Sequence, residues 1–183
     1  MELPAIAAAL PALGWALHGS LLARRLSTAR RDPLTGLHTR AGWTARAERI
    51  IARSPNALTL LVDLDDFKAI NDTHGHAAGD AVITATASRL ASWCHRHGTA
   101  ARLGGDEFAA IVADPAATSG TSTLTKALHH PVIHDDRLIP VSASVGFCHL
   151  TDLPVRTLTD ALAAADAAMY AAKGHSRRNQ HHH

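Results

Sequence analysis

Two short acidic segments carry side chains suited to metal and phosphate chemistry. Residues 63–66 read Asp-Leu-Asp-Asp, and Asp106 and Glu107 follow the glycine pair Gly104 and Gly105. Carboxylate oxygens are the hard ligands that Mg²⁺ prefers, usually together with the phosphates of a substrate. Two metal ions held in this way can activate an attacking hydroxyl and stabilise a leaving pyrophosphate. Acids at strand ends and turns are also commonly solvated caps, so neither segment is specific by itself.

Residues downstream of the first acidic segment would suit a purine nucleotide. Asn71 offers both a donor and an acceptor, and Asp80 can accept from the N–H groups of guanine. Lys68 and Lys173 could offset phosphate charge as compact cations.

Other polar residues of the same region are expected to have structural roles. Asp65 and Asp72 are of the kind that caps a helix or orients a turn. His74 and His76 are expected in turns and packing, because Mg²⁺ prefers oxygen ligands to nitrogen ligands.

The elements that must position these residues can be read from hydrophobic patterning. Residues 57–62 form an apolar run of strand length that ends directly before the first acidic segment. Residues 100–103 and 108–113 read as two strands around the Gly104–Gly105 turn. If these strands are neighbours in one sheet, the two acidic segments lie together at one edge.

The remaining pattern predicts further helices and one more hairpin. The hairpin would join 132–134 to 138–150, with Asp135 and Asp136 in its loop. Helical spacing predicts four helices, at 40–53, 77–94, 121–130 and 158–172.

Composition bounds the class of protein. A chain of 183 residues, 46% hydrophobic and 19% charged, indicates a globular fold of one domain. A net charge of +2 and an aromatic content of 4% argue against a nucleic-acid binder. Cys94 and Cys148 form neither a metal-binding pattern nor a disulfide framework, which favours the reducing cytoplasm.

The N-terminal segment at 3–23 contains no charged side chain. As a helix it would extend roughly 30 Å, about the thickness of one hydrocarbon core. Arg24, Arg25, Arg30 and Arg31 follow, and the positive-inside rule would then keep the C-terminal side in the cytoplasm. Two interpretations stay open: an anchor at the inner face of the cell membrane, or a soluble helix that packs against a partner as a dimerisation stalk.

We expect three parts along the chain. Residues 1–31 would form the apolar helix, and the turn-forming sequence Asp-Pro-Leu-Thr-Gly-Leu at 32–37 would open a domain at 32–180. The three histidines at 181–183 are read as a purification-tag remnant.

Five motifs in order resemble the GGDEF family, the diguanylate cyclases. Residues 103–108 contain the signature Gly-Gly-Asp-Glu-Phe. The other motifs are the Asp-Pro-Leu-Thr-Gly-Leu sequence, the segments at 63–72 and 75–80, and a basic motif at 172–179. The match extends over 32–179, and five motifs in the same order are far more specific than any one of them.

The resemblance implies a fold and a reaction. The fold would be α/β (α+β), with a palm-like, mainly antiparallel central sheet flanked by helices as in nucleotide cyclases. The reaction would condense two GTP molecules to cyclic di-GMP with release of two pyrophosphates, using Mg²⁺ or, in its place, Mn²⁺. A homodimer would be needed, because each domain binds one GTP.

The resemblance also assigns roles residue by residue. Metal ligands would be Asp63, the Leu64 carbonyl, Asp106 and Glu107, and Asp106 would also assist deprotonation of the attacking 3′-hydroxyl. The other roles are guanine binding by Asn71 and Asp80, phosphate contacts by Lys68, Lys173 and Arg177, and close approach to the triphosphate at Phe67, Gly104 and Gly105.

The chain departs from the family pattern in two places. The C-terminal motif usually reads Gly-Arg-Asn, whereas residues 176–179 read Ser-Arg-Arg-Asn, so Arg177 and Arg178 compete for the phosphate role. Many members carry an Arg-x-x-Asp motif that binds product and inhibits. The corresponding positions here are His95 and Gly98, so we expect no such inhibitory site.

Two alternatives to an active diguanylate cyclase remain. A catalytically weak domain could bind GTP or cyclic di-GMP as a sensor or scaffold, although the intact acids of the signature argue against it. An enzyme with altered nucleotide choice could make a mixed cyclic dinucleotide, although Asp80 at the guanine position favours GTP.

Overall fold

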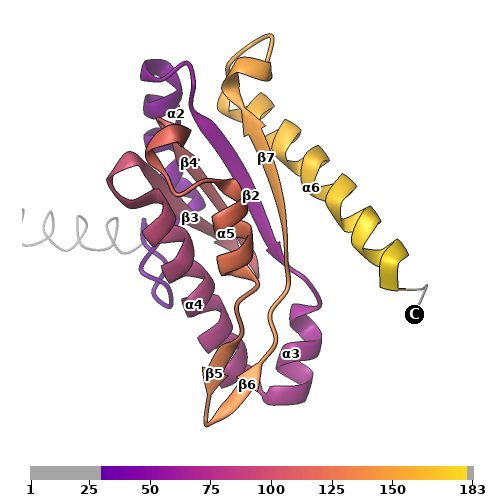
Figure 1. Cartoon of the computed structure of the whole chain (residues 1–183). Helices are drawn as coiled ribbons and strands as arrows, with labels where there is room; N and C mark the ends of the chain where they lie inside the picture. The colour runs from indigo at the N-terminus through magenta and orange to yellow at the C-terminus, as the bar shows by residue number, and fades with distance from the viewer. Residues whose placement is uncertain (1–29, 181–183) are drawn as a thin grey trace, which may run out of the picture.

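A five-stranded sheet with helices on both faces forms the centre of the protein (Figure 1). The computed structural model describes residues 30–180, with side chains as far as Lys173. The strands lie in the order β1 (His38–Thr39), β3 (Gly98–Gly104), β4 (Glu107–Val112), β2 (Leu58–Leu64) and β7 (Ala143–His149). Only the β1–β3 pair is parallel. The expected mainly antiparallel sheet flanked by helices is therefore confirmed.

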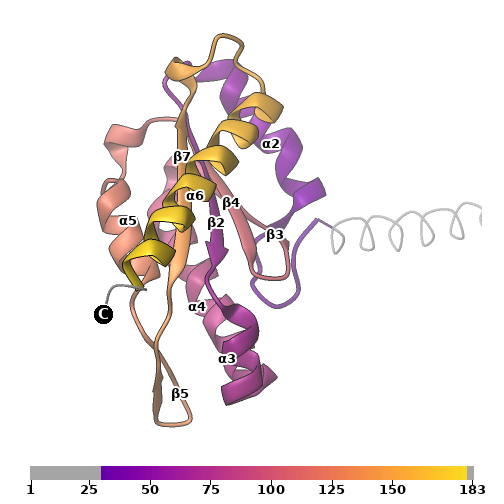
Figure 2. The ribbon, with the colours of Figure 1, turned by 90° about the vertical axis from the view of Figure 1, so that its right-hand side faces the viewer.

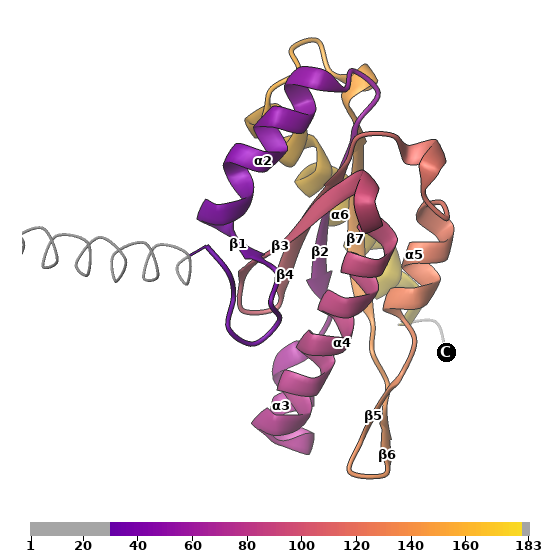
Figure 3. The same cartoon turned by 90° about the vertical axis from the view of Figure 1, so that its left-hand side faces the viewer.

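The two faces of the sheet carry separate hydrophobic clusters. Helices α4 (His76–Cys94) and α5 (Thr121–Leu128) lie over one face of the sheet (Figure 3). The core on that face includes the side chains of Leu60 and Val62. Helices α2 (Arg40–Arg53) and α6 (Leu158–Gln180) lie over the other face (Figure 2). The cluster on that face has Leu61 packed against it. This alternation along β2 is the period of two that a strand imposes on its side chains.

The long strand predicted at 138–150 is wrong as one element. Two short strands, β5 (Val132–His134) and β6 (Arg137–Ile139), form a separate hairpin, and β7 begins only at Ala143 and pairs with β2. Pro140 follows β6, and because proline has no backbone N–H it cannot continue the hydrogen-bonded ladder. The predicted loop residues Asp135 and Asp136 do form the hairpin turn, both with positive φ.

Helix α3 (Phe67–His74) and strand β1 were not expected from the sequence. Helix α3 is short, begins after Asp66 in the left-handed region (φ 51°) and ends at Gly75 (φ 84°). Phe67 and Ile70, one turn apart, pack against the core, but the helix is only eight residues long, too short for the repeated apolar spacing that reveals longer helices.

Cys94 and Cys148 are both free and buried, in line with the absence of a disulfide framework. Burial raises the pKa of the Cys94 thiol to about 12, so this thiol stays protonated.

Among the described helices, none combines the length and apolarity needed to cross a membrane. The expected anchor or stalk at 3–23 lies outside the described residues.

Candidate active site

The strand register brings the two acidic segments together, as expected. Asp63 at the end of β2 lies directly opposite Glu107 at the start of β4. Residues opposite each other on antiparallel strands have Cβ atoms about 5 Å apart and project from the same face. Asp106 lies in the adjoining turn, and its carbonyl accepts a 3.3 Å hydrogen bond from the Leu64 amide. The four predicted metal ligands therefore lie at one end of the β2–β4 pair.

Helix α6 supplies a cation to this group of carboxylates. The Nζ atom of Lys173 lies 2.5 Å from Oδ1 of Asp63, with the two side chains 29% and 21% exposed. Close packing of α6 on β7 places it there, because a Cβ atom at Gly146 would meet the Ala165 carbonyl oxygen at 1.9 Å. The side chains of Arg177 and Arg178 lie outside the described part of the chain.

The carboxylate oxygens at this edge suit a hard cation that takes some of its ligands from the protein and the others from a substrate. Within the part of the chain that the structure describes, no three His, Cys, Asp or Glu side chains gather into a metal cluster. The cross-strand pair Asp63 and Glu107 offers oxygen ligands only. Mg²⁺ typically binds through one or two carboxylates, retained water and substrate phosphates rather than in an all-protein cage. The residues present therefore fit Mg²⁺ bound together with a nucleotide.

Lys68 is not brought to the carboxylate pair. Its Nζ atom lies 2.5 Å from Asp72, one turn further along α3, and both side chains are mostly exposed. An exposed ion pair of this kind contributes little stability, so Lys68 can turn toward a ligand at small cost.

The predicted guanine-binding residues lie where α3 meets α4. A Cβ atom at Gly79 would come within 2.0 Å of the Asn71 Oδ1 atom, so the amide of Asn71 lies directly over Gly79. Asp80 is the next residue of α4 and is exposed. Glycine at 79 thus allows Asn71 and Asp80 to occupy neighbouring positions on two helices.

The glycine turn is tied to the start of the domain by a residue that the sequence analysis missed. Arg102 donates through Nε and Nη2 to the Gly105 carbonyl, at 2.9 and 2.7 Å. Its Nη1 atom lies 3.3 Å from both carboxylate oxygens of Asp32. Gly105 has φ 51°, a conformation that glycine adopts without the penalty of a side chain. Asp32 and Arg102 are 70 residues apart, so spacing gave no signal.

Asp32 is held in its ionised form by several donors. Burial by itself would raise the pKa of Asp32, but hydrogen bonds from the Thr35 hydroxyl and amide, together with Arg102, hold it below its ordinary value of 3.8. This group therefore stabilises the fold above pH 3.8, and the contribution is lost as pH falls through the lowered folded-state pKa.

Arg102→Ala is expected to lower the free energy of unfolding by about 2 kcal/mol at pH 7, because it removes a charge-assisted contact to Asp32. The difference from the unmutated protein should shrink below pH 3.8 as Asp32 becomes protonated. Urea unfolding across this pH range measures the effect, with Arg49→Ala on the exposed side of α2 as control. An equal loss at pH 7 and pH 3 would contradict the pairing.

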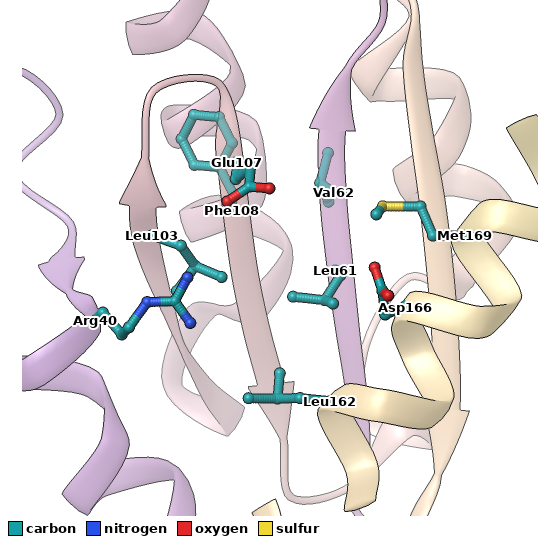
Figure 4. A pocket seen from close by; sticks show the side chains of 9 residues that line it. All are labelled: Arg40, Leu61, Val62, Leu103, Glu107, Phe108, Leu162, Asp166 and Met169. Carbon is teal, nitrogen blue, oxygen red and sulfur yellow. The ribbon is translucent and has the colours of Figure 1, made fainter. Parts of the chain in front are cut away.

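A cavity of about 170 Å³ adjoins Glu107 on the same face of the sheet (Figure 4). Leu61 and Leu103 are among the apolar side chains of its lining, and Arg40 of α2 and Asp166 of α6 add charged groups. Neither charged residue was predicted for the site. A signal existed for Asp166, because it precedes Lys173 by seven residues and so shares its face of the helix.

Comparisons with known protein sequences identify one family. A family model described as diguanylate cyclase, GGDEF domain, matches residues 29–180. An uncharacterized 19.3 kDa protein of Streptomyces ambofaciens is 66% identical over 178 residues, which is 97% of each chain. Diguanylate cyclase DgcN of Escherichia coli is 40% identical over 134 residues, covering 68% of this chain and 33% of DgcN. The chain thus spans about a third of that curated relative.

Solved structures show the same fold. The coiled coil and GGDEF domain of DgcB from Caulobacter crescentus, in complex with c-di-GMP, matches with a TM-score of 0.71 at 28% identity, over 94% of this chain and 95% of that one. A sensory box/GGDEF family protein from the same organism matches with a TM-score of 0.70 at 35% identity, over 80% and 99% of the two chains. The chain belongs to the diguanylate cyclase GGDEF-domain family.

Proposed function

We propose that the protein condenses two GTP molecules to cyclic di-GMP and two pyrophosphates. The observation that carries this proposal is the cross-strand pair of Asp63 and Glu107 with Lys173 on one of its carboxylates. In each half-reaction the 3′-oxygen of one GTP forms a bond to the α-phosphorus of the other. The bond from that phosphorus to the bridging oxygen breaks, and pyrophosphate leaves with the electron pair.

The protein's own groups would bind and orient the reactants. Asn71 and Asp80 would hold guanine, and Asp106 would take the proton from the attacking 3′-hydroxyl. Asp63, Glu107, the Leu64 carbonyl and Asp106 would hold Mg²⁺ or Mn²⁺, which supplies charge stabilisation at the phosphates. Three cationic side chains, those of Lys68, Lys173 and Arg177, would lie against the triphosphate, whose close approach uses the backbone at Phe67, Gly104 and Gly105.

The experiment is an incubation with GTP and Mg²⁺ in which pyrophosphate release is counted against GTP consumed. One pyrophosphate per GTP supports the proposal, whereas release of inorganic phosphate would indicate hydrolysis instead. Tight binding of GTP or cyclic di-GMP without turnover would favour the alternative of a sensor domain. The intact acids of the signature, Asp106 and Glu107, argue against this alternative.

The active species is expected to be a homodimer in the cytoplasm, because one domain holds one GTP and the product joins two. Specific activity should fall on dilution to nanomolar protein, and should fall further when residues 1–29 are deleted if that segment pairs domains or confines them at a membrane. Deletion to residue 29 keeps the Arg30 carbonyl, which accepts from the Thr39 amide at 3.1 Å. Constant specific activity over the whole dilution series would contradict a dissociating dimer.

We expect no tight product inhibition through the position of the missing Arg-x-x-Asp motif. Arg96 is exposed and lies between His95 and His97 in the sequence. The ring centroids of these two histidines are 6.5 Å apart. A neutral imidazole cannot reproduce the bidentate fork of arginine. Progress curves with added cyclic di-GMP and calorimetry test this. Submicromolar binding that disappears in a His95→Ala, Arg96→Ala double variant would show that a site exists there.

A further inference from the structure

The turn between β2 and α3, at 65–66, is held by residues at the start of β7 that lie outside the proposed ligand set. The turn is flanked by Leu64, the last residue of β2, whose carbonyl is proposed for the metal, and by Phe67, the first residue of α3, whose backbone is proposed for the triphosphate. Between them Asp66 adopts the left-handed conformation at φ 51°. Such a conformation costs most residues about 1–2 kcal/mol, and aspartate is among the few non-glycine residues that adopt it as single residues.

Asp65 connects the turn to the start of β7 through three hydrogen bonds, two of which involve Ser142, the exposed residue directly before the strand. Its carboxylate accepts from the Ser142 hydroxyl at 2.8 Å on Oδ2 and from the Ser144 hydroxyl at 2.7 Å on Oδ1. The Asp65 amide also donates to the Ser142 carbonyl at 2.9 Å. A hydroxyl has a single proton to donate, so both serines direct theirs at this carboxylate. Hydrogen bonds to an ionised acceptor are stronger than those between neutral groups.

Other contacts near the turn are mainly those of its flanking residues, since Leu64 and Phe67 pack in the hydrophobic core. The bond from the Leu64 amide to the Asp106 carbonyl is longer, at 3.3 Å, and no residue of α3 is fully buried. Elements with few buried contacts open locally at low cost. Ser144, by contrast, is only 7% exposed and lies opposite Asp63 in the β2–β7 register. Ser144 therefore belongs to a buried strand, whereas Asp65 lies in a turn between two elements.

We propose that Ser142 and Ser144 are positioning residues for the reaction, because through Asp65 they hold the Leu64 carbonyl and the Phe67 backbone where the metal and triphosphate bind. This inference rests on the proposed function. The two carboxylates then have different roles. Asp63 would bind the metal, whereas the carboxylate of Asp65 accepts hydrogen bonds from the two serines.

The kinetic test compares the Ser142→Ala, Ser144→Ala double variant with Ser122→Ala, an exposed serine of α5. Residues that orient metal ligands typically affect metal affinity or activity 10–100-fold. We expect the double variant to lose about 10–100-fold in kcat/KM for GTP and to need a correspondingly higher Mg²⁺ concentration for half-maximal rate. Ser142→Thr, which keeps the hydroxyl, should stay close to the unmutated protein. A double variant with lowered Tm but unchanged Mg²⁺ dependence would overturn the positioning role.

A second readout does not depend on turnover. Amide hydrogen exchange of a peptide covering 64–68 should become about tenfold faster in the double variant, since a charge-assisted contact is lost, and should not change in Ser122→Ala. Unchanged exchange would overturn the proposal even if activity fell. If the unmutated protein converts no GTP, the proposed function fails, and the exchange measurement alone then decides whether the serines hold the turn.

Discussion

Glu107→Gln is expected to reduce cyclic di-GMP formation by about 10³-fold or more. The amide keeps the size of the side chain but removes the negative charge opposite Asp63. Charge stabilisation by a bound metal contributes several kcal/mol to the transition state, and each 1.36 kcal/mol corresponds to a factor of ten in rate. Initial rates of product formation at saturating GTP and Mg²⁺ measure the loss.

Glu48→Gln is the matched control, because Glu48 is an exposed residue of α2 away from the carboxylate pair. It should keep the full rate. Calorimetry with GTP should still detect binding by the Glu107→Gln variant, since Asn71 and Asp80 remain. Turnover above about one percent of the unmutated rate would contradict the assignment of Glu107 to the metal, because the loss would then be less than about 100-fold.

The protein is expected to prefer GTP over ATP by about 10⁴-fold in kcat/KM, because adenine leaves the hydrogen-bonding groups of Asn71 and Asp80 unpaired. Asp80→Ala should reduce this preference by about 10²-fold or more, mainly by slowing the reaction of GTP. Competition between the two nucleotides in one reaction, with products separated by mass, gives the ratio directly.

Glu48→Ala serves as the control for loss of an exposed carboxylate and should leave the preference unchanged. If the unmutated protein uses ATP as well as GTP, the guanine-site assignment is wrong. A mixed cyclic dinucleotide as main product would favour the altered-nucleotide alternative.

The elements that surround the acidic pair were predictable because their signals are local. The apolar run before Asp63 and the two strands around Gly104 and Gly105 each fit within a few residues, and their antiparallel register places Asp63 against Glu107. Helix α3 escaped prediction because it is eight residues long and its packing against α4 depends on Gly79.

Long-range polar contacts could not be read from the sequence. Asp32 and Arg102 are 70 residues apart, and Asp65 and Ser144 are 79 apart. Such pairs have no fixed spacing, because they form only after the sheet has brought their strands together. Lys173 is 110 residues from Asp63, and it was expected at the phosphates as one of the few lysines and from the family resemblance. The carboxylate contact that it makes follows from the packing of α6 on the sheet.

The mass of the product formed from GTP and Mg²⁺ tests the central proposal most directly. Purified protein, with Glu107→Gln in parallel, is incubated with GTP and the nucleotides are identified by mass spectrometry. We expect cyclic di-GMP from the unmutated protein and none above background from the variant. GTP recovered intact from the unmutated protein, or a product formed equally by both proteins, would contradict it.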